Sequence, residues 1–347
     1  MKCAVVGASG YLGSELLRLL ASHPDLDVAS VQADSTAGRP LGEVVPALGA
    51  AYGGLVIGEL DAARLRAADA VFVALPSGAS QQLVPELVGA GPVVVDLGAD
   101  FRLKDAALYP QWYGWEHSCP SLLAGAVYGL PELFRKELAG AGLIASPGCY
   151  VTAAAMALAP LVASGLADPR DVIVDAASGT SGAGRSPRAG LHHPLANEAM
   201  AAYGLLSHRH TPEMEQVIGA RVLFTPHLAP MTRGILATCY ARATASATGA
   251  GGAAASSEAL VEYLRDRYAG EPFVNVRGPA ELPSTADAYG SNVVHLTARV
   301  DRRSGWIVTI SAIDNLVKGG AGQAIQAANL ALGLPETAGL PLAGLTP

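Results

Sequence analysis

The sequence predicts an α/β protein, with a doubly wound parallel sheet in a first domain and a mixed or antiparallel sheet in a second, α+β domain. Three observations carry this prediction. The chain has 347 residues and 50% of them are hydrophobic, which is enough to fill two cores. In the first third, short apolar runs alternate with a helical pattern, as in doubly wound sheets. Farther on, long strand patterns follow one another directly, which is typical of a mixed or antiparallel sheet.

The first domain opens with an apolar strand at Lys2–Val6, followed by leucines at helical spacing over Tyr11–Ala21. Asp27–Gln32 is the next predicted strand. Ala70–Leu75 and Pro92–Leu97 are runs of apolar and β-branched residues that stop at glycine-containing loops. Strands buried on both faces of a parallel sheet have this composition.

The second part of the chain changes pattern after residue 149. One helix is predicted over 153–163, and a last helix over 321–332. The stretch 244–257 is rich in Gly, Ala and Ser, and we interpret it as a flexible surface loop. Strands are predicted at 172–175, 220–224, 234–243, 292–300 and 306–312.

Composition and charge exclude several classes of function. The net charge of -7 and the absence of Lys/Arg-rich runs argue against a nucleic-acid or membrane-surface partner, so we expect a small-molecule substrate. The 4 cysteines form no CxxC pair, which suggests neither a metal site nor a disulfide framework. We expect a cytoplasmic protein, because no secretory signal and no membrane-spanning run is found.

A glycine loop directly follows the first strand and opens the first helix. Three glycines stand at the G-x-x-G-x-x-G spacing. Without side chains the backbone can turn tightly and approach a pyrophosphate, whose charge then lies at the positive end of the helix. This context predicts a dinucleotide site. The residues expected to hold the cofactor there are Gly7, Ser9, Gly10, Tyr11, Leu12 and Gly13.

The residues after the second strand point to two different cofactors. Asp34 lies about 20 residues past the loop, where an acidic side chain accepts from a ribose 2′-hydroxyl of NAD. Ser35, Thr36 and Arg39 follow it and are suited to a 2′-phosphate. From these residues alone, both NAD and NADP stay open.

Cys149 is the one cysteine in a setting that favours reaction. It precedes the helix predicted from residue 153, and backbone N–H groups at a helix N-terminus stabilise a thiolate. Cys3 and Cys239 lie in predicted strands and Cys119 in a loop, where a cysteine usually serves as a small apolar residue. The thiol therefore predicts nucleophilic catalysis.

Two histidines provide candidate acid/base groups for that thiol. His208 and His210 precede Thr211-Pro212-Glu213, a predicted helix start. His192 and His193 are interpreted as loop residues.

Five motifs together resemble the N-acetyl-gamma-glutamyl-phosphate reductases of arginine biosynthesis, in order and over essentially the whole chain. They are the glycine loop 7–13, Ser-Pro-Gly-Cys-Tyr at 146–150, Ser-Gly-Thr-Ser-Gly-Ala-Gly-Arg at 178–185, His-Arg-His-Thr-Pro-Glu at 208–213 and Asp-Asn-Leu-Val-Lys-Gly at 314–319.

The resemblance implies a role for each matching residue. Cys149 would be the nucleophile and His208 the acid/base. It also implies NADPH as the cofactor, with NAD left open because Asp34 departs from the expected pattern. Substrate contacts are expected from Ser181, Arg185, His210 and Arg233, and further cofactor contacts from Ser35, Arg39, Pro76 and Asn315, with no metal.

The resemblance also implies how the chain is organised. Residues 1–148 and 316–347 would form the dinucleotide-binding domain, to which the C-terminal helix returns, and residues 149–315 the catalytic and oligomerisation domain. A homo-oligomer, dimer or tetramer, is expected.

The implied reaction reduces N-acetylglutamyl phosphate to the semialdehyde. Cys149 attacks the acyl phosphate, phosphate leaves, and hydride converts the thioester to a hemithioacetal that collapses to the aldehyde. Two alternatives remain open: the related amino-adipyl-phosphate reductase of lysine biosynthesis, which acts on a carrier-protein-linked substrate, and a non-catalytic dinucleotide sensor.

Overall fold

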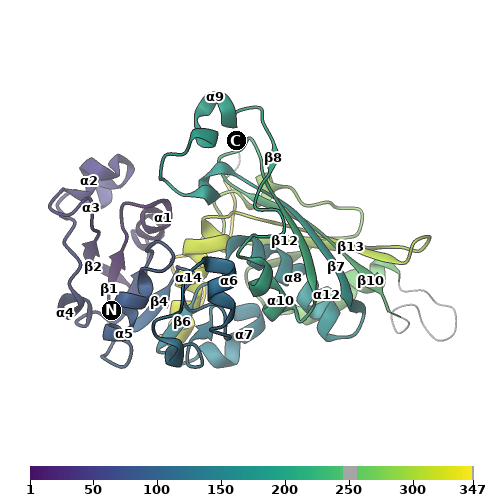
Figure 1. The fold of residues 1–347 in the computed structure, drawn as a ribbon, viewed down its shortest axis with the longest axis horizontal. Coiled ribbons are helices and arrows are strands. Elements are labelled where there is room, and N and C mark those ends of the chain that lie inside the picture. Colours follow the sequence, from purple (N-terminus) through teal and green to yellow (C-terminus); the bar gives the residue numbers. More distant parts are fainter. Residues whose placement is uncertain (245–255, 346–347) are drawn as a thin grey trace. The chain divides into compact units, whose positions relative to one another are not determined.

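The computed structural model describes residues 1–244 and 256–345, which form two compact units (Figure 1). The first unit contains Met1–Pro147 and Gly320–Leu340, and the second contains Gly148–Gly319 and the chain from Pro341 onward. The sequence predicts a surface loop over 244–257. Residues 245–255 of that stretch lie outside the described residues.

The first unit is built on a parallel sheet of 6 strands in the order β2-β1-β3-β4-β6-β5. Every residue of β3 and nearly every residue of β4 is buried, which explains their continuous apolar sequence. The strands are β1 (Lys2–Val6), β2 (Asp27–Gln32), β3 (Ala70–Val73), β4 (Val93–Asp96), β5 (Val127–Tyr128) and β6 (Leu143–Ala145).

Helices connect these strands as in a doubly wound fold. The last one, α14, comes from the C-terminal part of the chain and packs against β4 and α7. The helices of this unit are α1 (Tyr11–Leu20), α2 (Leu41–Val44), η1 (Pro46–Leu48), α3 (Gly49–Tyr52), α4 (Ala62–Leu65), α5 (Ser80–Leu87), α6 (Leu108–Tyr113), η2 (Pro120–Leu122), α7 (Pro131–Leu138) and α14 (Gly322–Ala331).

The second unit contains a mixed sheet of 7 strands in the order β11-β12-β13-β10-β7-β9-β8. The pairs β11–β12 and β7–β9 are parallel and the others antiparallel. Figure 1 shows the long strands β7, β10 and β13 running side by side. The strands are β7 (Ala167–Ser178), β8 (Ala201–Ala202), β9 (Val222–Leu228), β10 (Ile235–Ala243), β11 (Val274–Val276), β12 (Val294–Asp301) and β13 (Trp306–Ile313).

One face of this sheet is covered by α8, which contacts β7, β10, β12 and β13. Twelve successive residues of α8, 150–161, are buried, and the many alanines among them let the helix approach the sheet closely. α10 packs on α8 and on β9. The helices of this unit are α8 (Cys149–Ala163), η3 (Thr180–Ala183), η4 (Ala189–Leu191), α9 (His193–Ala196), α10 (Thr211–Ile218), α12 (Ser257–Arg267), α13 (Thr285–Ala288) and η5 (Val317–Ala321).

The predicted fold class is confirmed in both units. The structure adds two differences in detail. α8 begins at Cys149, four residues before its predicted start at 153, and His193 begins the short helix α9, so the interpretation of His193 as a loop residue is wrong. Pro194 supplies the reason, because proline is well suited to the first turn of a helix. In the described ranges no helix is long and apolar enough to cross a bilayer.

Candidate functional site

Cys149 is the first residue of α8, with Gly148 as the N-cap residue. Cys149 is partly buried, and it lies in the first turn, whose backbone N–H groups have no acceptor within the helix itself. Cys3 and Cys239 are buried in strands, and burial raises the pKa of both thiols to about 12. Those two cysteines therefore stay protonated at neutral pH, which leaves them as apolar core residues.

His210 lies directly against the turn that presents Cys149. A Cβ atom built on Gly148 would lie 2.6 Å from Nε2 of His210 and 2.8 Å from its Cε1. Only a residue without a side chain leaves room for the imidazole at this position. Of the two predicted histidines, His210 is thus the one that the structure places beside the N-cap of the thiol helix.

Glu213 connects α10, the helix that carries His210, to the turn at Gly148 by a hydrogen bond. It is fully buried, in the first turn of α10, and its Oε1 accepts a hydrogen bond of 2.8 Å from the backbone N–H of Gly148. His210 is the N-cap residue of α10, so the imidazole and the carboxylate both meet Gly148. The motif at 208–213 contained Glu213, but its role followed only from the structure.

His208 lies in an aromatic cluster behind His210. Its ring makes edge contacts with Tyr150, Tyr203 and Phe224, at centroid distances of 5.7, 5.5 and 5.2 Å. Nδ1 of His208 accepts a hydrogen bond of 3.1 Å from the backbone N–H of His210, so the neutral ring carries its proton on Nε2. Burial, together with the charge of Arg209, lowers the pKa of His208 to about 4. His208 is therefore neutral at physiological pH and is a weak base.

Two tyrosines that the sequence did not single out complete this cluster. The hydroxyl of Tyr203 donates to that of Tyr150 at 3.1 Å, and Tyr150 donates to the carbonyl of His227 at 3.0 Å. Burial raises the pKa of Tyr150, which keeps its hydroxyl protonated. Tyr150 follows Cys149 directly, and its ring also meets His210 at 5.9 Å.

Three of the other predicted site residues converge at the end of β13. Asn315 is buried, its Oδ1 accepts from the backbone N–H of Gly234 at 2.7 Å, and its Nδ2 donates to Oγ of Ser181 at 3.0 Å. Arg233 forms an ion pair of 3.0 Å with the fully buried Asp314. Asn315 therefore joins the segment of Ser181 to that of Arg233 through both ends of its amide.

Arg185 lies exposed in the segment that follows η3, four residues beyond Ser181.

The predicted cofactor loop adopts the conformation that its glycines require. Gly7 has a φ of 81°, and a Cβ there would lie 2.3 Å from the carbonyl oxygen of Ala74. A Cβ on Gly13 would lie 2.2 Å from the carbonyl oxygen of Gly7. A Cβ on Gly10 would meet nothing nearer than 3.5 Å. Gly7 and Gly13 thus serve close packing of the loop, and the space at Gly10 is open.

This loop stands at the point where the strand order of the first sheet reverses. β1 lies between β2 and β3, so the chain leaves it toward one side of the sheet and later continues on the other. Ligands of doubly wound sheets bind at such a point. Ser9 and Leu12 are partly exposed there, and Tyr11 is exposed.

The other predicted cofactor residues lie on the loops that follow the neighbouring strands. Pro76 is exposed after β3, and Asp34, Ser35 and Arg39 are exposed after β2. This arrangement suits a dinucleotide whose pyrophosphate meets the first turn of α1 and whose adenosine ribose meets the end of β2.

Comparison with known proteins identifies the family. Residues 2–141 match the family described as "Semialdehyde dehydrogenase, NAD binding domain", and residues 149–315 match "Semialdehyde dehydrogenase, dimerisation domain". A protein of Symbiobacterium thermophilum named N-acetyl-gamma-glutamyl-phosphate reductase is 47% identical over 99% of this chain and 98% of its own. One of Pelotomaculum thermopropionicum with the same name is 46% identical over 100% of this chain and 99% of its own.

The chain belongs to the N-acetyl-gamma-glutamyl-phosphate reductase family.

Solved structures agree with the fold of this reductase family member. A probable aspartate-semialdehyde dehydrogenase from Pseudomonas aeruginosa has a TM-score of 0.68 at 19% identity, over 95% of this chain and 98% of the other. Aspartate semialdehyde dehydrogenase with NADP from Candida albicans also has a TM-score of 0.68, at 16% identity, over 96% of this chain and 99% of the other. At such identities the likeness shows the fold alone.

The resemblance inferred from the five motifs is thereby confirmed, and so is the prediction of an oxidoreductase family. The relatives carry the name of the glutamyl-phosphate reductase, so the amino-adipyl alternative is not favoured.

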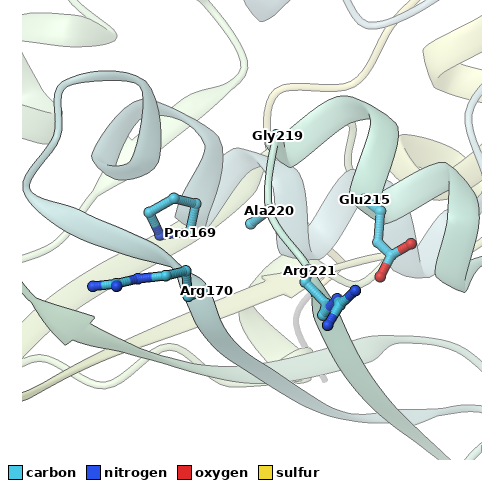
Figure 2. A pocket seen from close by; sticks show the side chains of 6 residues that line it. All are labelled: Pro169, Arg170, Glu215, Gly219, Ala220 and Arg221. Atoms are coloured by element: carbon cyan, nitrogen blue, oxygen red, sulfur yellow. The ribbon is translucent and has the colours of Figure 1, made fainter.

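The second unit has a surface hollow at the C-terminal end of α10. His210 lies at the other end of this helix. Figure 2 shows its lining side chains, among them Arg170, Glu215 and Arg221. Arg170 is engaged with Asp168 at 2.5 Å, and the C-terminal end of a helix repels anions. These features do not suit a phosphate-bearing substrate, and we assign the hollow no catalytic role.

Proposed function

We propose that this protein reduces N-acetyl-L-glutamyl 5-phosphate to N-acetyl-L-glutamate 5-semialdehyde, with NADPH, through a thioester on Cys149, in arginine biosynthesis. The observation that carries the proposal is the imidazole of His210 lying against Gly148, next to a cysteine that begins a helix. The names of the relatives supply the substrate class.

In the first step Cys149 forms a bond from its sulfur to the acyl carbon, and the bond from that carbon to the phosphate oxygen breaks. Inorganic phosphate leaves with the electron pair of that bond. The N-terminal N–H groups of α8 stabilise the thiolate before attack. A thioester is thereby formed on this chain.

His210 is the group that we propose to hold the proton of the thiol. The resemblance gave this role to His208, but the low pKa of His208 makes it a weak base, while His210 stands against the residue before Cys149. Glu213 holds α10 on the Gly148 turn and so keeps the imidazole in place. When the aldehyde leaves, the same imidazole would return a proton to the sulfur.

NADPH, when bound, supplies the hydride that reduces the thioester carbon. The residues proposed to hold it are those of the glycine loop, with Ser35 and Arg39 toward the 2′-phosphate, Pro76 in a loop near the cofactor and Asn315 toward the nicotinamide. The close packing of Gly7 and Gly13 and the open space at Gly10 suit a backbone cradle for a pyrophosphate.

For the substrate, we propose contacts from Ser181, Arg185 and Arg233. Arg233 keeps a fixed guanidinium because Asp314 pairs with it. The predictions of a cytoplasmic homo-oligomer, and of a dinucleotide-binding domain at 1–148 and 316–347 with a catalytic and oligomerisation domain at 149–315, stay predictions.

The test is a reversible assay with the purified chain. With N-acetylglutamate semialdehyde, NADP and inorganic phosphate, we expect NADPH formation that depends on phosphate, because phosphate must resolve the thioester. Treatment with iodoacetamide should abolish turnover while nucleotide binding persists. Turnover only on the carrier-linked amino-adipyl substrate would contradict the proposal. Nucleotide binding without turnover on either substrate would identify a sensor.

A further inference from the structure

A π-helical turn, η5, follows β13 and carries the end of the motif at 314–319. The N–H of Gly319, within this turn, donates a hydrogen bond to the carbonyl of Asp314, five residues earlier, at 2.9 Å. Single π-turns of this kind are rare and occur frequently at functional sites.

The start of the π-turn is held by the carboxylate of Asp314. Oδ1 accepts hydrogen bonds from the N–H groups of Leu316 and Val317, at 2.9 and 3.1 Å. Oδ2 accepts from the N–H of Gly290 at 2.7 Å and pairs with Arg233. Asp314 is 0% exposed, so these bonds are shielded from water. The backbone of the turn has little freedom to move.

Gly319, a residue of this turn, lies against the side chain of Cys149. A Cβ atom built on Gly319 would lie 2.8 Å from Cβ of Cys149, with Cδ1 of Ile313 at 3.3 Å and the carbonyl oxygen of Asp314 at 3.4 Å. The φ of Gly319 is not in the left-handed region, so its backbone conformation does not demand glycine. The reason for a glycine here is the closeness of Cys149.

We propose that Gly319 is a positioning residue for the thiol: the π-turn seats its bare backbone against Cβ of Cys149 and so holds the Cys149 side chain at the start of α8. A cysteine at the first position of a helix has more than one staggered χ1 conformation open to it. Backbone in contact with Cβ on one side narrows that choice. The proposal rests on the proposed function only in that Cys149 is the nucleophile.

The first test is alkylation of Cys149 by iodoacetamide between pH 6 and 9, followed by mass spectrometry of the Cys149 peptide. In Gly319→Ala we expect the rate at pH 8 to fall about tenfold and its pH midpoint to rise, because the displaced thiol loses the helix N–H groups. The control is Gly142→Ala, where an added Cβ meets nothing within 4 Å. Gly319→Ala within about twofold of the parent would overturn the proposal.

A second measurement separates the local contact from general damage to the fold. Gly319→Ala should lower the Tm by about 3 °C or more in the parent, and by much less in the Cys149→Gly background, where the obstructing Cβ is gone. An equal drop in both backgrounds overturns the proposal. So does failure of both Gly319→Ala and the double variant to fold, because the obstruction would then not be Cys149.

A third measurement is steady-state turnover. Gly319→Ala should reduce kcat on the order of 10²-fold while the KM for NADPH stays unchanged, since the glycine loop is untouched. An unchanged kcat overturns the proposal. If the parent chain itself does not turn over N-acetylglutamyl phosphate, the proposed function fails, yet alkylation and melting still decide the role of Gly319.

Discussion

The imidazole of His210 occupies the space above Gly148 that the side chain of any other residue would fill, with Nε2 only 2.6 Å from the position of a Cβ. This relationship joins the N-cap of the thiol helix to the N-cap of α10. We therefore expect His210 to be the imidazole that acts with the thiol of Cys149.

Replacing Cys149 with Ser should reduce turnover on the order of 10³-fold or more, because an alcohol is a poor nucleophile at neutral pH. The Kd for NADPH should stay close to that of the parent. Cys119→Ser is the matched control, since that cysteine lies beside the short helix η2 in the other unit. Substantial activity in Cys149→Ser would rule out a covalent mechanism.

His210→Asn should lower kcat by on the order of 10²-fold or more, the usual contribution of a positioned acid/base. His208→Asn should lower it by only about tenfold, which corresponds to one lost hydrogen bond to the His210 backbone. The pH profiles discriminate further. His208 has a pKa of about 4, so the loss of its side chain should leave the pH profile of kcat above pH 5 unchanged. The reverse ranking would return the acid/base role to His208.

The two glycines of the cofactor loop should respond differently to substitution. Gly13→Ala places a Cβ 2.2 Å from a backbone oxygen, so it should lower the free energy of unfolding by about 1–3 kcal/mol. A Cβ on Gly10 meets nothing nearer than 3.5 Å, so Gly10→Val should fold like the parent, but it should weaken nucleotide binding by obstructing the pyrophosphate. Urea unfolding and nucleotide titration measure the two effects. Unchanged affinity in Gly10→Val would contradict the assignment of the loop.

Cofactor choice depends on the loop after β2. Arg39→Ala should lose about 1.5–3 kcal/mol of NADPH binding and little NADH binding, as expected for a charge-assisted contact with the 2′-phosphate. Asp34→Ala is the matched variant, and it should weaken NADH selectively if Asp34 holds the ribose hydroxyls. Equal losses of both nucleotides in Arg39→Ala would show that the arginine is structural.

Asp96, at the end of β4, should make stability depend on pH. It is 0% exposed, its Oδ2 has no hydrogen-bond partner, and burial, with repulsion from Asp100, raises its pKa from 3.8 to about 7. Between pH 4 and 7 the folded chain keeps this proton and the unfolded chain releases it. Stability contributed by Asp96 is therefore present at low pH and is lost as pH rises through this window.

Asp96→Asn removes that titration, so its stability relative to the parent should increase from pH 5 to pH 8, by about 1.4 kcal/mol for each pH unit between pH 5 and the folded-state pKa of about 7. Urea midpoints at the two pH values measure the change. Asp34→Asn, at an exposed carboxylate of the same unit, is the control. An identical pH dependence of parent and Asp96→Asn would show that Asp96 is ionised in the folded chain.

Much of this protein was predictable from local sequence. The glycine loop between a strand and a helix, the apolar runs of the parallel sheet and the long strands of the second unit are short-range patterns, because periodicity and turn chemistry act over a few residues. Cys149 at a helix start is also a local feature, although the helix begins earlier than its apolar pattern indicated. The five motifs, in their order along the chain, were sufficient to identify the family.

Only the tertiary structure showed how the site is held together. Gly148 meets His210, Gly319 meets Cys149, and Asn315 joins Ser181 to Gly234, all between segments far apart in the chain. The preference for His210 over His208 likewise depends on the tertiary structure, because burial lowers the pKa of His208. Sequence patterns report which side chains are present and on which element. The packing of the elements decides which side chains touch. In a closely packed site the space beside Gly148 holds either the ring of His210 or a Cβ, and not both.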